Sequence, residues 1–527
     1  MARQHVLIDG AWRPAQAVGG LRSVNPATGE PLQTEYPISA WADWETALEA
    51  SATAALVLRE TSPQLLAIFL NRFAERIEKR AGEIVEMASI ETALPKMPRL
   101  ASVELPRTTG QLRQAAAAAI EGSWALPTID TKLNIHSRHA AIGPVCIFGP
   151  NNFPLAFNGV SGGDFAAAIA AGNPVISKAH PSHPGTTKLL AEEAFAAVGE
   201  AGLPPATVQM IYHLSVRDGL RLVGDERVGA TGFTGSRAAG LALKAAADVA
   251  GKPIYLEMSS LNPVIILPGA LRERGEKLCE EYADSCLAAG GQFCTKPGLL
   301  LLIASDASES FIRGLKDRFV ARPSAALLSP AVGDSLGKNL KTLMAAGARV
   351  VSGGEAAQGP GRRYENTLLR VDGSGFLAEP HLLQTEAFGN AGLVVVASDA
   401  EQAGEILTAL EGQLTGSIYS SASGADDALY EVLAPILRRK VGRLLNDKMP
   451  TGVAVSPAMH HGGPYPATGY PGFTSVGIPA SMRRFSQLEC YDNVRPNRLP
   501  AILADANPAG RAWRLIDGAW TRADVAV

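Results

Sequence analysis

The segment GGQFCT, residues 290–295, places Cys294 shortly after two glycines. Glycine adopts backbone conformations that other residues avoid, so the pair predicts a tight loop that carries the thiol. A cysteine nucleophile needs exposure, a lowered pKa and nearby backbone N–H donors. The alternative is a buried cysteine that packs as a small apolar residue, and we keep that interpretation for Cys146, Cys279 and Cys286.

Two further segments offer polar groups suited to acyl chemistry. Glu257, in YLEMSS (residues 255–260), ends an apolar strand run, which is where parallel sheets build their sites. It could act as a general base, although a solvated strand-end glutamate is equally consistent with this segment. The Asn152 side-chain amide, in GPNNFP (residues 149–154), could donate to an oxyanion, and the alternative is an Asn-rich turn.

Two more segments suggest a phosphate-bearing ligand. In GFTGSRAAG (residues 232–240), a turn around Gly235 and Ser236 leads from a strand into a helix, whose free N–H groups attract phosphate. The segment lacks the GxGxxG pattern, so an ordinary strand-to-helix turn is the alternative. In SKAHPS (residues 177–182), Lys178 follows a strand and could bind ribose or phosphate, unless it is simply solvated.

Alternating elements must position these groups. Short apolar runs alternate with Ala-rich helical stretches from about residue 140 to 305, which predicts βαβ units and a parallel sheet. A second alternating stretch over about 297–420 predicts another α/β unit. Strands are expected over 141–148, 174–178, 208–212, 229–233 and 253–257, and helices over 64–87, 162–171, 186–198 and 238–249.

Two other features of the sequence, outside this alternation, also predict local structure. The Gly- and Pro-rich stretch 450–479 is expected to be loop. The hexapeptide LIDGAW occurs at residues 7–12 and again at 515–520. Asp-Gly between apolar residues predicts a hairpin turn in each copy, and we expect both hairpins to cover the same surface.

Composition sets broad limits on function. The 527 residues predict two to four structural units, and 46% hydrophobic and 19% charged residues are ordinary for a globular protein. A net charge of -3 gives no reason to expect nucleic acid or a membrane as partner. The chain has no secretory leader, no membrane-spanning run, and five cysteines without metal-ligand spacing. We expect a soluble cytoplasmic protein with no metal site.

Six motifs, taken together and in order, resemble the aldehyde dehydrogenase superfamily over about residues 5–495: FGPNNFP, the lysine of SKAHP, GFTGS, YLEMSSLNP, GGQFC and TEAFG. The resemblance implies an α/β aldehyde dehydrogenase fold. Its parts would be a Rossmann-like cofactor domain (1–127 and 141–258), an α/β catalytic domain (259–458), a small β oligomerisation element (128–140 and 480–496) and a C-terminal extension (497–527). It also implies a homodimer or homotetramer, in which the segment near 482–491 pairs with a neighbouring subunit.

The resemblance assigns roles to the three polar groups. The Cys294 thiolate would add to an aldehyde, and the Asn152 amide and the Cys294 backbone N–H would hold the oxyanion. After hydride transfer to a nicotinamide, Glu257 would activate water to hydrolyse the thioester to a carboxylic acid. Branches that pass the acyl group to coenzyme A often lack this glutamate, so its presence favours hydrolysis.

The resemblance also implies the cofactor residues Lys178, Ser182, Gly235, Ser236, Glu386 and Phe388. Glu386, in TEAFG, would hold the nicotinamide ribose, Lys178 the adenine-side ribose, and Gly235-Ser236 would face the pyrophosphate. NAD-preferring relatives often place a glutamate three residues after the lysine, where this chain has Pro181. Nothing acidic in that segment opposes a 2′-phosphate, so we expect NADP first and NAD as a possible second cofactor.

Longer stretches, such as GGDFAAAIAAGNPVI and HHGGPYPAT, resemble an NADP-using branch of the family. That branch includes 2-oxoglutarate semialdehyde (2,5-dioxopentanoate) dehydrogenases, and this semialdehyde is our predicted substrate. Alternatives are a long-chain or broad-specificity aldehyde dehydrogenase, an enzyme that transfers the acyl group to coenzyme A, and a non-catalytic cofactor-binding relative. The joint presence of Cys294, Asn152 and Glu257 disfavours the last.

Overall fold

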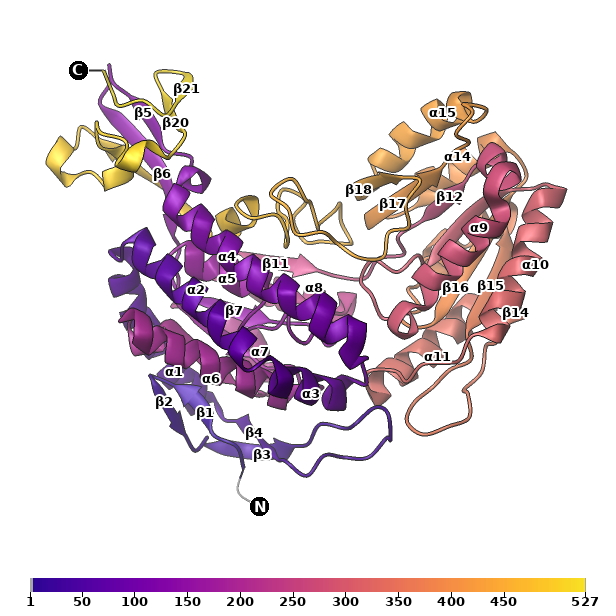
Figure 1. Ribbon diagram of the computed structural model, residues 1–527, viewed down its shortest axis with the longest axis horizontal. Helices are drawn as coiled ribbons and strands as arrows, with labels where there is room; N and C mark the ends of the chain where they lie inside the picture. Colours follow the sequence, from indigo (N-terminus) through magenta and orange to yellow (C-terminus); the bar gives the residue numbers. More distant parts are fainter. Residues whose placement is uncertain (1–2, 527) are drawn as a thin grey trace.

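The computed structural model describes residues 3–526, which form two large sheets in separate halves of the molecule and a smaller third sheet (Figure 1). The first sheet has the order β11-β10-β7-β8-β9-β1-β2. The five strands from β11 to β9 are parallel and are joined by helices, as the alternating pattern predicts. The strands are β1 (Val6–Ile8), β2 (Ala11–Arg13), β7 (Val145–Phe148), β8 (Val175–Lys178), β9 (Val208–Ile211), β10 (Ala230–Thr234) and β11 (Ile254–Glu257).

Helices flank the first sheet and bury its apolar strands. Within this layer α2 packs against α4 and α6. The helices are α1 (Trp41–Arg59), α2 (Pro63–Lys79), α3 (Ala81–Thr92), α4 (Leu105–Glu121), α5 (Gly163–Ala170), α6 (Pro184–Ala201), α7 (Val216–Val223) and α8 (Arg237–Val249). The single strand expected over 141–148 is wrong, because residues 142–144 separate β6 from β7 and Gly143 adopts φ +111°.

The second sheet has the order β14-β15-β16-β13-β12-β17-β18. Its central strands are buried on both faces, which explains their unbroken apolar runs. The strands are β12 (Val264–Ile266), β13 (Leu299–Ile303), β14 (Arg349–Ser352), β15 (Thr367–Asp372), β16 (Ala391–Ala397), β17 (Gln413–Tyr419) and β18 (Val441–Asn446). The helices are α9 (Pro268–Leu287), α10 (Asp306–Ala321), α11 (Pro330–Ala345), α12 (Gly373–Ala378), α13 (Pro380–Leu383), α14 (Ala400–Ala409) and α15 (Asp427–Arg438).

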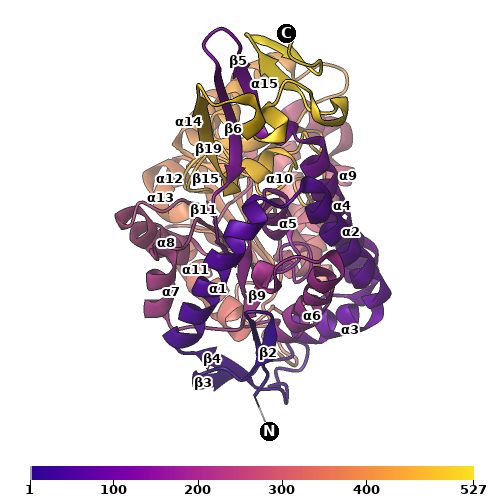
Figure 2. The same cartoon turned by 90° about the vertical axis from the view of Figure 1, so that its left-hand side faces the viewer.

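The third sheet stands at one end of the molecule (Figure 2), in the order β19-β6-β5-β20-β21. Its strands are β5 (Thr128–Asp130), β6 (Ile135–Ala141), β19 (Ser486–Asp492), β20 (Arg514–Ile516) and β21 (Ala519–Thr521). β19 pairs along its length with β6 of the same chain, and its other edge ends the sheet. The pairing of this region with a neighbouring subunit stays a prediction.

Both LIDGAW segments form hairpins, as their Asp-Gly turns predict. Asp9 and Asp517 adopt φ +50° and +48°, and the glycine that follows each also has positive φ. The expectation that the two hairpins cover the same surface is wrong. β1 joins β9 in the first sheet, whereas β20 joins β5 in the third, so they lie at opposite ends of the molecule (Figures 1 and 2).

The stretch 450–479 contains no helix or strand, as its composition predicts. It runs between the last strand of the second sheet and the third sheet, and it passes the middle of the molecule (Figure 1). Two more strands, β3 (Ala17–Leu21) and β4 (Tyr36–Ser39), form a separate hairpin. None of the helices over residues 3–526 is long and apolar enough to cross a membrane.

Candidate active site

Cys294 lies on the loop between α9 and β13, at the junction of the two halves. Ahead of it, Gly290 and Gly291 both adopt φ +68°, and a Cβ on Gly291 would overlap the backbone of Gly389. This bend requires glycine, as the doublet in the sequence predicts. The Asn262 amide then donates to the carbonyl oxygen of Cys294 at 2.9 Å, which holds the loop against the start of the second sheet.

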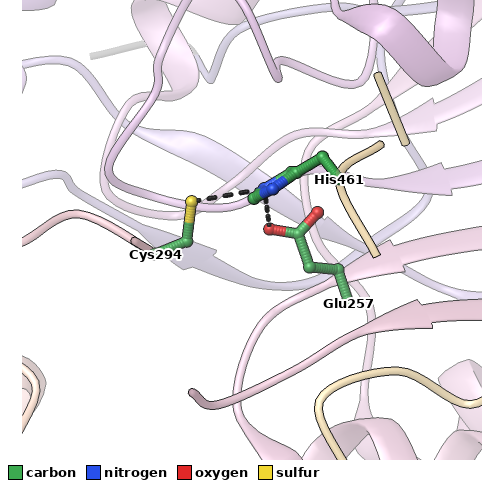
Figure 3. A group of neighbouring side chains, drawn as sticks. All are labelled: Glu257, Cys294 and His461. Atoms are coloured by element: carbon green, nitrogen blue, oxygen red, sulfur yellow. Dashed lines mark hydrogen bonds and ion pairs between the residues drawn. The ribbon is translucent and has the colours of Figure 1, made fainter. Parts of the chain in front are cut away.

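The Cys294 thiol faces a histidine and a glutamate (Figure 3). Its Sγ lies 3.5 Å from Nε2 of His461, and that nitrogen lies 2.9 Å from Oε1 of Glu257. Oγ of Ser475 donates to the other carboxylate oxygen at 2.8 Å. Because Nε2 carries at most one hydrogen, it either accepts from the thiol or donates to the carboxylate. His461 is therefore placed to carry a proton between Cys294 and Glu257.

Burial and charge set the protonation of this cluster. Burial raises the pKa of the Cys294 thiol well above its usual value, and the negative charge of Glu257 raises it further. Burial also acts to raise the pKa of Glu257, but the charge of His461 and hydrogen bonds from His461 and Ser475 outweigh it, so that pKa is lowered. The thiol pKa is therefore shifted opposite to the lowering that makes a cysteine reactive. A neutral thiol beside a carboxylate must pass its proton to a base before it attacks.

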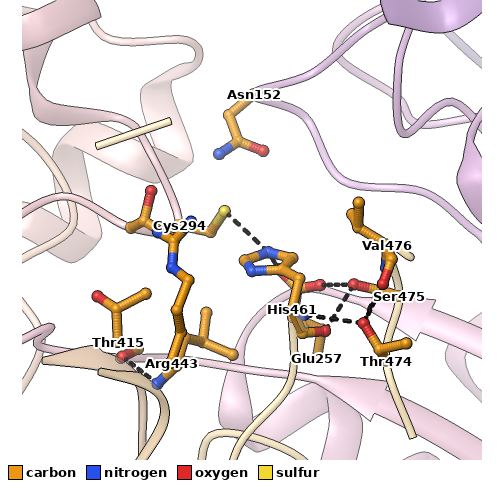
Figure 4. Close-up of polar contacts among 12 residues, drawn as sticks. Asn152, Glu257, Cys294, Thr415, Arg443, His461, Thr474, Ser475 and Val476 are labelled. Carbon is orange, nitrogen blue, oxygen red and sulfur yellow. Dashed lines mark hydrogen bonds and ion pairs between the residues drawn. The ribbon is translucent and has the colours of Figure 1, made fainter. Parts of the chain in front are cut away.

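Asn152 is buried above the thiol (Figure 4). Its Nδ2 donates one hydrogen to the carbonyl oxygen of Gln292 at 3.0 Å, and the backbone carbonyl oxygen of Asn152 accepts from Arg99 at 3.0 Å. The first contact fixes the orientation of the side-chain amide, and the second holds the backbone that carries it. An amide nitrogen has two hydrogens, so a second donor remains for a negative oxygen that forms next to Cys294.

A cavity of about 1010 Å³ adjoins the thiol. Every predicted site residue except Lys178 lines it: Asn152, Ser182, Gly235, Ser236, Glu257, Cys294, Glu386 and Phe388. Lys178 ends β8, and burial lowers its pKa to about 8. Its charge acts on His180 and His213, so it lies next to the part of the cavity wall that contains His180.

The cavity fits a dinucleotide in size and in its polar groups. Ser236 is the N-cap of α8, and its side chain accepts from the backbone N–H of Ala239, so the helix start faces the cavity. Burial raises the pKa of Glu386 to about 6, and the buried ammonium of Lys296 acts in the opposite direction. The volume is at the upper end for small-molecule sites, as a ligand with two linked nucleotides requires.

Sequence reasoning missed three residues that hold the site together: His461, Ser475 and Asn262. His461 and Ser475 lie in the stretch 450–479, for which only a loop was predicted, although its His-His doublet was a usable signal. Sγ, an imidazole nitrogen and a carboxylate oxygen of Cys294, His461 and Glu257 lie within 4.8 Å of one another. Such a donor set suits a zinc-like ion, and no spacing along the chain predicts it.

Comparison with known proteins places this geometry in context. Residues 12–434 match the aldehyde dehydrogenase family. The chain is 38% identical to alpha-ketoglutaric semialdehyde dehydrogenase 2 of Azospirillum brasilense, over 97% of this chain and 98% of that protein. It is 36% identical to the alpha-ketoglutaric semialdehyde dehydrogenase of Acinetobacter baylyi, over 95% of this chain and 96% of the relative.

Solved structures with similar folds have more distant sequences. PnpE from Pseudomonas sp. WBC-3 superposes with a TM-score of 0.79 at 22% identity, covering 94% of this chain and 99% of PnpE. A variant of aldehyde dehydrogenase C from Pseudomonas syringae, solved with NAD+ and octanal, gives 0.79 at 19% identity, covering 94% and 98%. At these identities the likeness establishes the fold.

Proposed function

The chain belongs to the aldehyde dehydrogenase family, and on that premise we propose that it oxidises 2-oxoglutarate semialdehyde to 2-oxoglutarate, with NADP as the preferred acceptor. The observation that carries the proposal is the contact of the Cys294 thiol with His461 and Glu257 at the wall of the 1010 Å³ cavity. The names of the two relatives at 38% and 36% identity support the choice of aldehyde.

The thiol, imidazole and amide would perform the first step. His461 accepts the thiol proton across the 3.5 Å contact, and the positive ring is stabilised by the Glu257 carboxylate 2.9 Å away. The sulfur then bonds to the aldehyde carbon while the carbonyl π electrons move to its oxygen. The free hydrogen of the Asn152 amide and the Cys294 backbone N–H hold that negative oxygen.

NADP, when bound in the cavity, supplies the acceptor for the hydride that leaves the tetrahedral carbon. Glu257 then takes a proton from a water molecule that attacks the Cys294 thioester. The carbon–sulfur bond breaks, the acid leaves, the thiolate regains a proton from His461, and Glu257 releases the proton of the water to solvent. Ser475, which donates to Glu257 at 2.8 Å, orients the carboxylate for this proton transfer.

The preference for NADP is supported by the wall around residues 180–182. The carboxylates that line the cavity within residues 3–526 are Glu257 and Glu386, and both act electrostatically on Cys294 rather than on this wall. Pro181 stands where a repelling carboxylate would exclude a 2′-phosphate, and Lys178 is nearby. Comparing kcat/KM for NADP and NAD tests this, and a strong preference for NAD would contradict it.

The first sheet with its helices supports a cofactor-binding domain over 1–127 and 141–258, and the second sheet supports a catalytic domain over 259–458. The outer edge of β19, in the segment 480–496, supports assembly into a dimer or tetramer. Light scattering on the purified protein would measure its mass in solution. A cytoplasmic location stays a prediction.

An NADPH-formation screen would test the proposed activity. The panel would contain 2-oxoglutarate semialdehyde, pentanal, long aliphatic aldehydes and aromatic aldehydes, each with NADP and with NAD. The semialdehyde should give the highest kcat/KM. A long-chain aldehyde in first place would favour that alternative, a requirement for coenzyme A would favour acyl transfer, and cofactor binding without oxidation would favour a non-catalytic relative.

A further inference from the structure

Two arginines lie near Cys294 but outside the wall of the cofactor cavity. Arg107 is in the first turn of α4, and Arg443, which is labelled in Figure 4, is in the middle of β18. Arg107 lies against the rings of Phe153 and Phe157, and Arg443 contacts the sulfur of Met459; these three residues belong to or pack against the apolar cluster that Cys294 adjoins. Neither lines the 1010 Å³ cavity. The two arginines therefore form a part of the thiol's surroundings that is separate from the cofactor residues.

Arg107 forms no salt bridge within residues 3–526, although the charges of Glu104 and Glu257 act on it. Its Nε and Nη2 atoms are enclosed and have no hydrogen-bond partner within residues 3–526. Glu104, three residues earlier, is already engaged by Arg99 and by the backbone N–H of Leu155 at 2.8 Å. A buried charge without a partner is costly, and such costs are common where a ligand supplies the partner.

Arg443 is fixed in place and adds a second positive charge. Its Nη2 donates to the carbonyl oxygen of Pro450 at 3.0 Å, while its Nε has no partner within residues 3–526. Burial lowers the pKa of Arg443, and the like charge of Arg107 lowers it further. Two neighbouring cations that repel each other next to a reactive thiol form a natural site for an anion.

Aromatic rings complete the surroundings of Arg107. Its guanidinium carbon lies 4.9 Å from the ring centre of Phe157 and 5.7 Å from that of Phe153. Both rings belong to an apolar cluster that Phe293 and Cys294 adjoin. An apolar wall that begins at the thiol and reaches a guanidinium suits a short carbon chain with an aldehyde at one end and an anion at the other.

We propose that Arg107, assisted by Arg443, binds the carboxylate of the substrate and so directs its aldehyde carbon to Cys294. This inference rests on the proposed aldehyde oxidation and adds the residues that recognise the terminal carboxylate of the substrate. The planar guanidinium offers two parallel N–H groups, which match the two oxygens of a carboxylate. The 2-oxo acid end of 2-oxoglutarate semialdehyde has this group.

The test compares two aldehydes of equal carbon number, 2-oxoglutarate semialdehyde and pentanal, which lacks the carboxylate. Losing a hydrogen-bonded charge pair should lower kcat/KM of Arg107→Met for the semialdehyde by roughly 10- to 100-fold. Its kcat/KM for pentanal should fall by a clearly smaller factor, because pentanal has no carboxylate contact to lose and only the effect of the guanidinium on the Cys294 thiol changes. Arg107→Lys should recover part of the loss, because lysine restores the positive charge but not the two parallel N–H groups of the guanidinium.

Arg113→Met is the matched control. Arg113 lies on the same helix but pairs with Glu78 at the surface, so both aldehydes should be oxidised at the parent rate. An equal loss of both aldehydes in Arg107→Met, with a shifted pH profile, would mean that Arg107 acts on the thiol and would overturn the proposal. Unchanged kcat/KM for the semialdehyde would overturn it as well.

A binding measurement separates this inference from the proposed activity. 2-Oxopentanoate keeps the carboxylate and replaces the aldehyde with a methyl group, so it binds without reacting. Calorimetry should show its Kd rising by about 10-fold or more in Arg107→Met and unchanged in Arg113→Met. Equal Kd values in the parent and in Arg107→Met would contradict the carboxylate site even if the semialdehyde is oxidised. Anion binding without oxidation of any aldehyde would uphold the site and contradict the activity.

Discussion

Replacing His461 with asparagine tests the proton transfer on which the proposed mechanism depends. The change removes the nitrogen that lies 3.5 Å from the Cys294 sulfur and 2.9 Å from Glu257. A positioned proton acceptor contributes roughly 100- to 10,000-fold to rate. Because Glu257 itself lies within reach of the thiol, we expect the lower end, about 100-fold in kcat/KM, or about 2.7 kcal/mol.

The same variant should shift the pH dependence. His461 contributes to the lowered pKa of Glu257, whereas burial acts to raise it, so removing the imidazole lets the pKa rise. The unprotonated base then forms only at higher pH, and the acid limb of kcat/KM moves upward. Stability changes in the same sense: a lowered carboxyl pKa stabilises the fold above the unfolded-state pKa, and this contribution is lost as pH falls through the folded-state pKa.

Two assays would measure these effects. Iodoacetamide alkylation of Cys294 over a pH range reports thiolate formation, and the pH profile of kcat/KM reports the base. His460→Asn is the matched control, since His460 neighbours His461 on the loop but is not part of the group of Cys294, Glu257 and His461. Parent-like alkylation and turnover in His461→Asn, with an unshifted acid limb, would refute the reasoning.

Three further outcomes are expected. Cys294→Ala should abolish turnover yet nearly keep the parent melting temperature and NADP affinity, because the change removes only one sulfur atom from a partly buried loop residue; residual oxidation would identify another nucleophile. Gly291→Ala should lower the free energy of unfolding by about 2 kcal/mol or more and reduce activity, because φ +68° and the carbonyl of Gly389 exclude a Cβ; a denaturant titration would show this. Zn²⁺ should inhibit reversibly through the sulfur, nitrogen and oxygen of the cluster, with EDTA restoring activity and His461→Asn being less sensitive; equal sensitivity of that variant would argue against binding there.

Local patterns predicted much of the fold. Apart from the strand expected over 141–148, the parallel strands of the first sheet and the helices expected over 162–171, 186–198 and 238–249 fall within a few residues of their expected positions, because each element carries its own apolar periodicity and turn residues. The bend at Gly290 and Gly291 is likewise a local property. The resemblance to a family added the overall architecture, which periodicity alone does not give.

Long-range contacts set the limits of sequence reasoning. His461 is 167 residues from Cys294 and 204 from Glu257, and nothing local to a Gly- and Pro-rich loop indicates that it reaches them. The raised thiol pKa likewise results from burial beside Glu257, which only the folded chain creates. Arg107 forms no salt bridge with Glu104 because Glu104 already pairs with Arg99 and accepts hydrogen bonds from backbone N–H groups. This arrangement, too, exists only in the folded chain.

The most direct test of the account is a product analysis with purified protein, 2-oxoglutarate semialdehyde and NADP, in the absence of coenzyme A. The account predicts one NADPH and one 2-oxoglutarate for each semialdehyde consumed, with both products missing in Cys294→Ala. No NADPH from the parent protein, or equal turnover by Cys294→Ala, would contradict it.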